Sequence, residues 1–246
     1  MSLSWRNKQL RIGLAPDRIY LTGAKSVDLP ANDGSWAAPA EALGAALAGH
    51  KGTAAVVLAD QFVRYALLGY NETLKTPEQW QALAAHRFGT LHGPRAAEWQ
   101  VNITETAPMG PRIACAVDRA LITRLADIFA TAGLHLASVQ PFLVAAFNRI
   151  RKSVGNGSCW IVVEEPGRLT LALIQRGMWL AIRGRRVEKG WKSVLPEILE
   201  RESAFLGLSQ PVTRVIVCAQ GDFDTEMYQA WRTEALGYRE LALAGE

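Results

Sequence analysis

The sequence predicts a duplicated α/β fold built from two similar halves, and three observations support this. Strand-like and helix-like patterns alternate along the chain. Each half opens with two strands around a proline-containing turn, Pro16-Asp17 in the first and Glu165-Pro166-Gly167 in the second. Between the halves, Ser153–Ser158 is rich in glycine and serine, which is typical of a linker. We therefore expect two units, residues 1–152 and 159–246.

The strands of the first half are short apolar runs rich in β-branched residues. They are predicted at Arg11–Ala15, Arg18–Thr22, Ala54–Leu58, Phe62–Leu68, Trp99–Ile103, Arg112–Val117 and Leu134–Val139. Ala54–Leu58 and Phe62–Leu68 are interpreted as a strand pair.

Capping residues locate the helices of this half. One helix begins at Thr76-Pro77 and ends at Gly93. Asp118 caps another, which Gly133 closes. The remaining two helices are predicted from near Pro39, with Leu43 and Leu47 on one face, and over Phe142–Ile150.

The second half repeats the opening meander before its helices. The predicted strands are Cys159–Glu164, Leu169–Gln175, Met178–Val187, Thr213–Cys218 and Tyr238–Ala244. Helices are predicted over Ser193–Gly207 and Asp222–Leu236. The similarity of the halves is one of pattern, not of residue identity.

Composition limits the class of protein. The 246 residues are 49% apolar and 20% charged, which excludes a disordered or collagen-like chain. No apolar run approaches the roughly 18–20 residues of a membrane span. Ser4–Gln9 contains no apolar signal core, so we expect a cytoplasmic protein that is neither secreted nor anchored. The net charge of +4 favours anionic partners without specifying one.

Common catalytic and metal-binding motifs are not found. The three cysteines, Cys115, Cys159 and Cys218, have no CxxC spacing and sit in apolar stretches, as expected for buried thiols in a reducing compartment. The four histidines show no metal-ligand spacing, and no GxSxG motif occurs. The first strand has no carboxylate, which argues against a two-metal nuclease. We predict no metal and no catalytic residue.

One long segment resembles a known protein family. Arg112–Arg149 reads RIACAVDRALITRLADIFATAGLHLASVQPFLVAAFNR, a strand, a helix, an AGL turn, a strand, then proline and a short helix. With Asp60–Leu68, the helix Pro77–Leu91 and the hairpin Trp160–Val187, it is similar to a divergent bacterial branch of the actin-like (ribonuclease H-like) fold. That branch includes the cytoplasmic domain of the type II secretion L protein and the type IV pilus assembly M protein.

The resemblance implies where a nucleotide would bind, because actin-like ATPases hold ATP between their halves. The matching positions here are Gly13 and Arg18 in the first turn, Glu164 and Gly167 in the second, and Gly221 in the adenosine turn. All three turns depart from the family pattern. Pro16 and Pro166 intrude, the phosphate-binding hydroxyls are missing, and Pro16 removes an N–H donor. ATP is therefore a cofactor only in an alternative interpretation.

A basic hairpin is the candidate partner surface. It carries Arg176, Arg183, Arg185, Arg186, Lys189 and Lys192, with Trp179 in the same segment. Tryptophan and arginine are enriched at binding hot spots. They also protect a solvated sheet edge, and they can contact an acidic partner or anionic headgroups.

The leading hypothesis is a non-catalytic actin-like scaffold. It would bind inner-membrane proteins of a type IV pilus or type II secretion assembly from the cytoplasmic side, reaching the membrane only through them. Family resemblance implies docking of a short partner peptide, for which the Phe62–Tyr70 edge is one candidate. A second hypothesis is an actin-like ATPase with a degenerate site. The third is an anion or nucleic-acid-binding module using the basic hairpin, although no aromatic interleaving supports nucleic acid.

Overall fold

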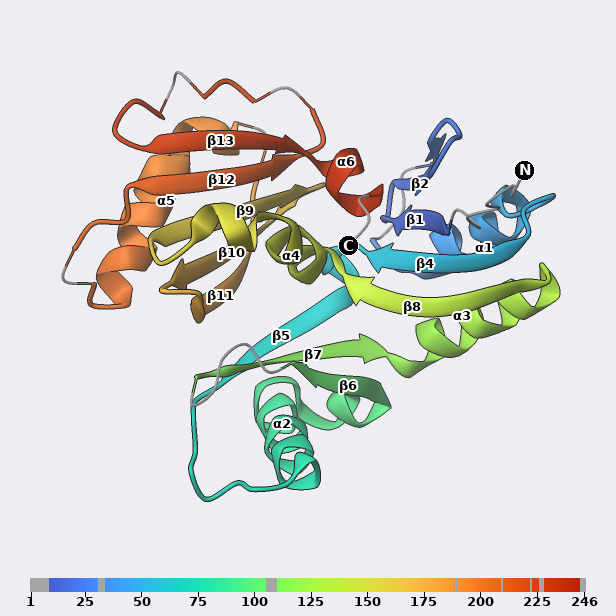
Figure 1. The fold of residues 1–246 in the computed structure, drawn as a ribbon, viewed down its shortest axis with the longest axis horizontal. Coiled ribbons are helices and arrows are strands. Elements are labelled where there is room, and N and C mark those ends of the chain that lie inside the picture. Colours follow the sequence, from blue (N-terminus) through green and yellow to red (C-terminus); the bar gives the residue numbers. More distant parts are fainter. Residues whose placement is uncertain are drawn as a thin grey trace, which may run out of the picture.

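Two five-stranded mixed sheets with the same strand layout form the framework (Figure 1). The computed structural model describes residues 9–30, 34–104, 110–188, 190–208, 210–221, 223–225 and 228–243. The first sheet has the order β3-β2-β1-β4-β8, and the second has the order β11-β10-β9-β12-β13. In each, an antiparallel meander is followed by two parallel strands. The predicted duplication within an α/β fold is confirmed.

The strand bounds are as follows. The first sheet contains β1 (Leu10–Leu14), β2 (Arg18–Leu21), β3 (Val27–Asp28), β4 (Gly52–Leu58) and β8 (Leu134–Pro141). The second contains β9 (Ser158–Glu165), β10 (Arg168–Gln175), β11 (Met178–Arg186), β12 (Arg214–Ala219) and β13 (Arg232–Gly237). The three cysteines are free and buried, as predicted.

Helices cover the sheets and connect them. The first sheet packs with α1 (Ala37–Ala46) and α3 (Arg119–Thr131), while α5 (Trp191–Phe205) packs in the core of the second. Two further helices, α4 (Phe142–Val154) and α6 (Tyr238–Leu243), contact each other and elements of both sheets. Their first residues stack, with the rings of Phe142 and Tyr238 3.8 Å apart between centroids and nearly parallel. These two helices therefore join the two sheets at one packed crossing.

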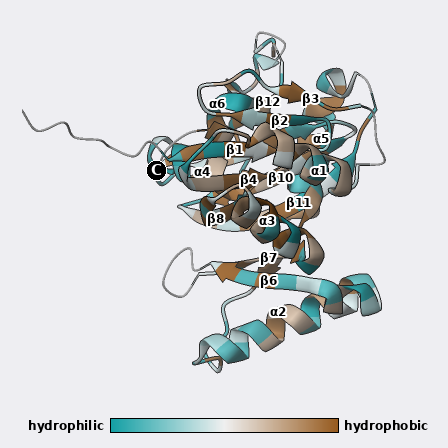
Figure 2. Ribbon diagram, turned by 90° about the vertical axis from the view of Figure 1, so that its right-hand side faces the viewer, coloured by the Kyte–Doolittle hydropathy of each residue, from teal (hydrophilic) through white to brown (hydrophobic). Residues whose placement is uncertain are grey.

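A third, smaller sheet projects from this body together with one helix (Figure 2). It has the order β5-β7-β6, with β5 at Val63–Leu68, β7 at Arg112–Asp118 and β6 at Trp99–Thr104. Helix α2 (Pro77–His92) covers one face, where Trp80 and Phe88 pack on Trp99. Its start carries the predicted cap, a capping box between Thr76 and Gln79.

The predicted pairing of Ala54–Leu58 with Phe62–Leu68 is wrong. Strand β4 pairs with β1 and β8, whereas β5 pairs with β7 in the small sheet. A single 3₁₀ turn, η1 (Asp60–Phe62), separates them and redirects the chain. Alternation of apolar residues identifies a strand but not its partner, which long-range packing selects.

The predicted end of the chain is also wrong in part. We expected a helix over Asp222–Leu236 and a strand over Tyr238–Ala244, but the strand β13 occupies the end of the first range and the helix α6 most of the second. Asp222, Glu226, Met227 and Ala244 lie outside the described residues. Tyr238, Leu241 and Ala242 are buried at the spacing of a helix face. A pattern of only three apolar residues is too short to distinguish a helix from a strand.

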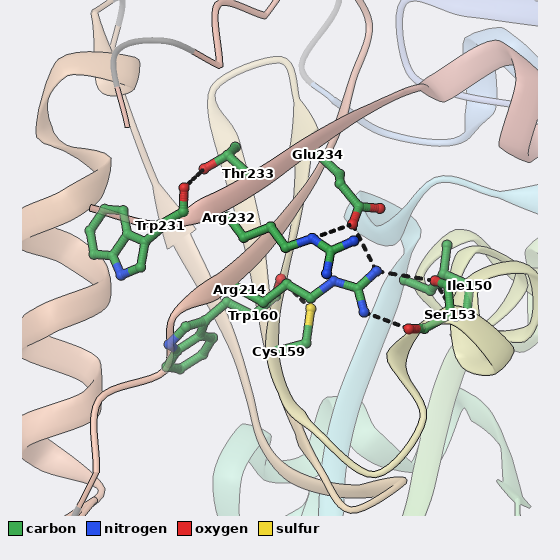
Figure 3. Close-up of polar contacts among 9 residues, drawn as sticks. All are labelled: Ile150, Ser153, Cys159, Trp160, Arg214, Trp231, Arg232, Thr233 and Glu234. Carbon is green, nitrogen blue, oxygen red and sulfur yellow. Dashed lines mark hydrogen bonds and ion pairs between the residues drawn. The ribbon is translucent and has the colours of Figure 1, made fainter. Parts of the chain in front are cut away.

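The predicted linker lies where α4 passes into β9. The helix ends at Val154, Gly155 has a positive φ of 56°, and β9 begins at Ser158. Figure 3 shows how this end is fixed: Arg214 donates to the Ser153 carbonyl at 2.6 Å and to the Glu234 carboxylate at 2.8 Å. The division into two units at this linker stays a prediction. Within the described chain, no helix is long and apolar enough to cross a membrane.

Candidate functional site

Two buried acids meet where the two large sheets face each other. Asp60 follows β4 of the first sheet, and Glu165 ends β9 of the second. The Glu165 carboxylate accepts the backbone N–H groups of Asp60 at 2.6 Å and Gln61 at 2.7 Å, and the Tyr238 hydroxyl at 3.0 Å. The Asp60 carboxylate accepts the Leu143 N–H at 3.0 Å and the Tyr65 hydroxyl. Leu143, the second residue of α4, and Tyr238, the first residue of α6, thus both donate hydrogen bonds to this acid pair.

Burial raises the pKa of both acids. The pKa of Asp60 rises to about 6 mainly because the carboxyl is desolvated, although the Tyr65 and Leu143 hydrogen bonds act in the opposite direction. The pKa of Glu165 rises to about 8 because of desolvation and then the nearby Asp60 charge. The pair therefore retains at least one proton at neutral pH. The sequence signal for Asp60 is an acid two residues after the apolar strand Ala54–Leu58.

The residues predicted from the actin-like phosphate turns are placed separately. Arg18 forms an ion pair with Asp28 on β3, and Glu164 accepts the Trp191 indole N–H at 3.1 Å. Gly167 lies in the β9–β10 turn with a positive φ of 71°. Gly221 follows β12 in a bend with open space around its Cα. Among the described contacts, Arg18 and Glu164 thus have different partners.

Gly13 has a packing role in this structure. A Cβ added at this position would lie 2.9 Å from the Ala242 Cβ and 3.0 Å from the Tyr20 ring. Real Cβ atoms do not approach that closely, so the missing side chain is what allows α6 to lie directly on β1. The glycine predicted for phosphate binding thus provides the space for the second crossing helix.

These turns do not fit the phosphates and metal of an actin-like nucleotide. The inward-pointing group of the second turn is the Glu165 carboxyl, which already takes up two backbone N–H donors of the facing half. Phosphate binding requires such donors to be available and requires cations or N–H groups, not buried acids. Among the described residues, no group of three or more His, Cys, Asp or Glu side chains could hold a metal ion.

A groove of about 550 Å³ lies beside the acid pair, between the small sheet and the first large sheet. One wall is β6, which presents Gln100, Asn102 and Thr104; the other is β8 from Leu136 to Pro141. The floor is mostly apolar and contains Leu58, Cys115, Val117, Ile122 and Val144. Burial, and then the Asp60 charge, raises the pKa of the Cys115 thiol to about 12, which keeps it protonated and unreactive.

The two walls of the groove differ in the hydrogen bonds that their backbone groups form. On β6, the Trp99 carbonyl accepts from Arg119 at 3.4 Å and the Val101 carbonyl accepts from Gln81 at 2.9 Å. Strand β8 ends the first sheet and pairs with β4 on one side only, with a bulge at Ala137. Its other edge faces the groove. The sequence did not reveal this groove, because its walls come from segments about 35 residues apart that the fold brings together.

The basic hairpin is compensated in part. Arg183 and Arg185 both approach the Glu202 carboxylate of α5, at 3.9 and 3.3 Å. Arg186 is exposed, and Arg176 occupies the β10–β11 turn with a φ of 52°. Trp179 is 1% exposed and packs against the Phe147 ring, so it does not belong to the surface on which we placed it. Lys189 lies outside the described residues.

Comparison with known proteins identifies the fold. No family model and no curated protein matches the chain. A solved structure of a PilM-PilN type IV pilus biogenesis complex matches with a TM-score of 0.67 and 12% identity, covering 97% of this chain and 90% of that one. A Bacteroides thetaiotaomicron protein with an actin-like ATPase fold and unknown function matches with a TM-score of 0.62, 14% identity, and coverage of 97% and 96%.

A third match comes from a secretion system. The cytoplasmic domain of EpsL, an inner-membrane component of the type II secretion system of Vibrio cholerae, aligns with a TM-score of 0.58 and 13% identity over 95% of this chain and 92% of that one. At such identities the similarity establishes the fold and not the activity. The chain therefore has an actin-like fold and resembles, over most of its length, the pilus protein PilM and the cytoplasmic domain of EpsL.

Proposed function

We propose that this protein is a non-catalytic actin-like scaffold that binds an extended peptide of an inner-membrane pilus or secretion protein in the β6–β8 groove. The observation that supports this most directly is the groove itself. It combines an apolar floor, a row of uncharged polar side chains on β6, and the edge of β8. An extended peptide can add to such an edge through its backbone while alternate side chains enter the floor.

The structural neighbours support the class of partner. One neighbour comes from a PilM-PilN type IV pilus biogenesis complex, and another is the cytoplasmic domain of an inner-membrane secretion component. This chain shares their fold over at least 95% of its length. By analogy, we assign it to the cytoplasmic side of such an assembly, with the membrane reached through the bound partner.

The acid pair supports a scaffold that does not turn over nucleotide. Glu165 and Asp60 hold the two sheets together through N–H groups, and within the described part of the chain no basic side chain hydrogen-bonds either carboxylate. A phosphate placed there would face these two buried carboxyl groups. The partner groove, in contrast, lies outside this closed centre and is open in the same conformation.

Fluorescence anisotropy tests the proposed function. Labelled peptides covering the cytoplasmic segments of inner-membrane pilus and secretion proteins from the same organism are titrated with the intact chain. We expect at least one to bind with a Kd below about 100 µM, equivalent to roughly −5.5 kcal/mol. Asn102→Arg places a long side chain across the groove and should weaken binding tenfold or more.

His86→Arg is the matched control. It adds the same side chain to the exposed outer surface of α2, away from the groove, and should bind like the unmodified chain. Failure of every peptide to bind, or equal binding by Asn102→Arg and His86→Arg, would contradict this assignment.

A further inference from the structure

A second pocket, of about 440 Å³, lies between α4, α6 and the first sheet. Its cationic side chains come from two elements: Arg11 from β1, and Arg149, Arg151 and Lys152 from α4. Among the residues that the structure describes, none of those lining this pocket is acidic. Four positive groups around one concavity create a local potential that attracts anions.

Helix termini alone do not account for this charge. Arg151 and Lys152 lie in the last turn of α4, where cations commonly complement the helix dipole. Arg149 precedes that turn, and Arg11 belongs to a strand of the first sheet. The convergence of these two on the same pocket is a separate observation, produced by the packing of α4 over the sheet.

The remaining lining suits a ligand with both a charged and an apolar part. Ser138, Gln140 and Asn148 can donate hydrogen bonds to oxygen atoms. Ala55, Val57, Ala145 and Leu241 form an apolar surface beside them. Arginine forks pair well with the oxygens of a phosphate, and a lysine adds a point charge.

We propose that this pocket binds a phosphate group carried on a small organic body, either an anionic lipid headgroup or a soluble organic phosphate. The proposal rests on this pocket and not on peptide binding in the β6–β8 groove. The two sites adjoin, because Ser138, Gln140 and Asn148 line both. Arg149 and Lys152 line only this second pocket, and Asn102 lines only the β6–β8 groove. Variants at these positions therefore separate the two proposals.

Two binding measurements on the intact chain test the proposal and distinguish the sources. Calorimetric titration with inorganic pyrophosphate probes a soluble phosphate. Co-sedimentation with vesicles of 30% phosphatidylglycerol in phosphatidylcholine, against pure phosphatidylcholine vesicles, probes a headgroup. The double variant Arg149→Gln/Lys152→Gln removes two cations and keeps good helix formers. We expect it to weaken binding about tenfold or more, as loss of charged hydrogen bonds does.

Arg87→Gln is the matched control, since Arg87 is exposed on α2 and lies outside the pocket. Pyrophosphate binding that only the double variant loses indicates a soluble phosphate, and selective loss of phosphatidylglycerol vesicle binding indicates a headgroup; either supports the proposal. No binding of either probe overturns it, as does binding that the double variant and Arg87→Gln share equally. Arg149→Gln alone repeats the test if the double variant does not fold.

Discussion

Glu165 accepts the backbone N–H of Asp60 at 2.6 Å, joining the end of β9 in one large sheet to the 3₁₀ turn that follows β4 of the other. The two residues are 105 positions apart in the chain. Both side chains are buried, at 2% and 0% exposure. An actin-like nucleotide would lie between these halves, and here the protein's own side chains bridge them. The Asp60–Glu165 contact is therefore a direct link between the two halves of the actin-like fold.

The acid pair should make stability decrease as pH rises. Folded-state pKa values of about 6 for Asp60 and about 8 for Glu165 exceed the value of about 4 in an unfolded chain. The folded protein thus holds more protons between about pH 4 and pH 8. The contribution of this difference to the free energy of unfolding is fully present below about pH 4, and it is lost as the pH rises through 6 and then 8.

Glu165→Gln tests this pH dependence, since the neutral amide cannot titrate. The free energy of unfolding, measured in urea at pH 5, 7 and 8.5, should fall less steeply with pH in this variant than in the unmodified chain. Glu164→Gln is the control, because Glu164 points instead to Trp191. A slope for Glu165→Gln equal to that for Glu164→Gln would show that the pair does not titrate as described.

Gly13→Ala should destabilise the protein. The new methyl group would overlap the Ala242 Cβ, so α6 must move off β1. Overpacking of this kind costs about 1–3 kcal/mol. Urea unfolding measures the loss. Gly89→Ala in α2 is the control, because its Cβ meets nothing within 4 Å and alanine favours a helix by roughly 0.5–1 kcal/mol. Unchanged stability of Gly13→Ala would mean that α6 does not pack closely on β1.

Arg214→Ala should loosen the end of α4. Arg214 is 14% exposed and joins Ser153 to Glu234, so its removal leaves a carboxylate and a helix carbonyl without this donor (Figure 3). We expect a loss of about 1–3 kcal/mol in the free energy of unfolding. Arg232 approaches the same Glu234 at 3.7 Å but is 78% exposed, so Arg232→Ala should change stability by less than about 0.5 kcal/mol. Equal effects of the two substitutions would contradict this assignment.

ATP should bind weakly or not at all. The Asp60 and Gln61 N–H groups are taken up by Glu165, and two buried acids would face the phosphates. Calorimetric titration with ATP and magnesium should give no Kd tighter than about 1 mM, equivalent to roughly −4 kcal/mol. A tighter Kd that Gly13→Ala or Gly221→Ala weakens would favour the alternative of a nucleotide-dependent protein.

Local pattern was sufficient for most elements of the first half and for the β9–β11 meander. Thr76 with Gln79, and Asp118 with Ala120, form the caps that their residue types predict. Strand partners were not predictable in the same way. Strand β5 joins β7 because Val63–Leu68 aligns with Arg112–Val117 through tertiary packing, and nothing in the strand itself selects that neighbour.

The sequence by itself determined the α/β class, the repeated hairpin in each half, the departures at Pro16 and Pro166, and the burial of the cysteines. These features depend on residue type and spacing over a few positions. Only the tertiary structure decided that Asp60 meets Glu165, that Gly13 makes room for α6, and that Arg11 converges with Arg149. Each of these contacts joins residues more than 80 positions apart, so it depends on how whole sheets and helices pack and not on any local propensity.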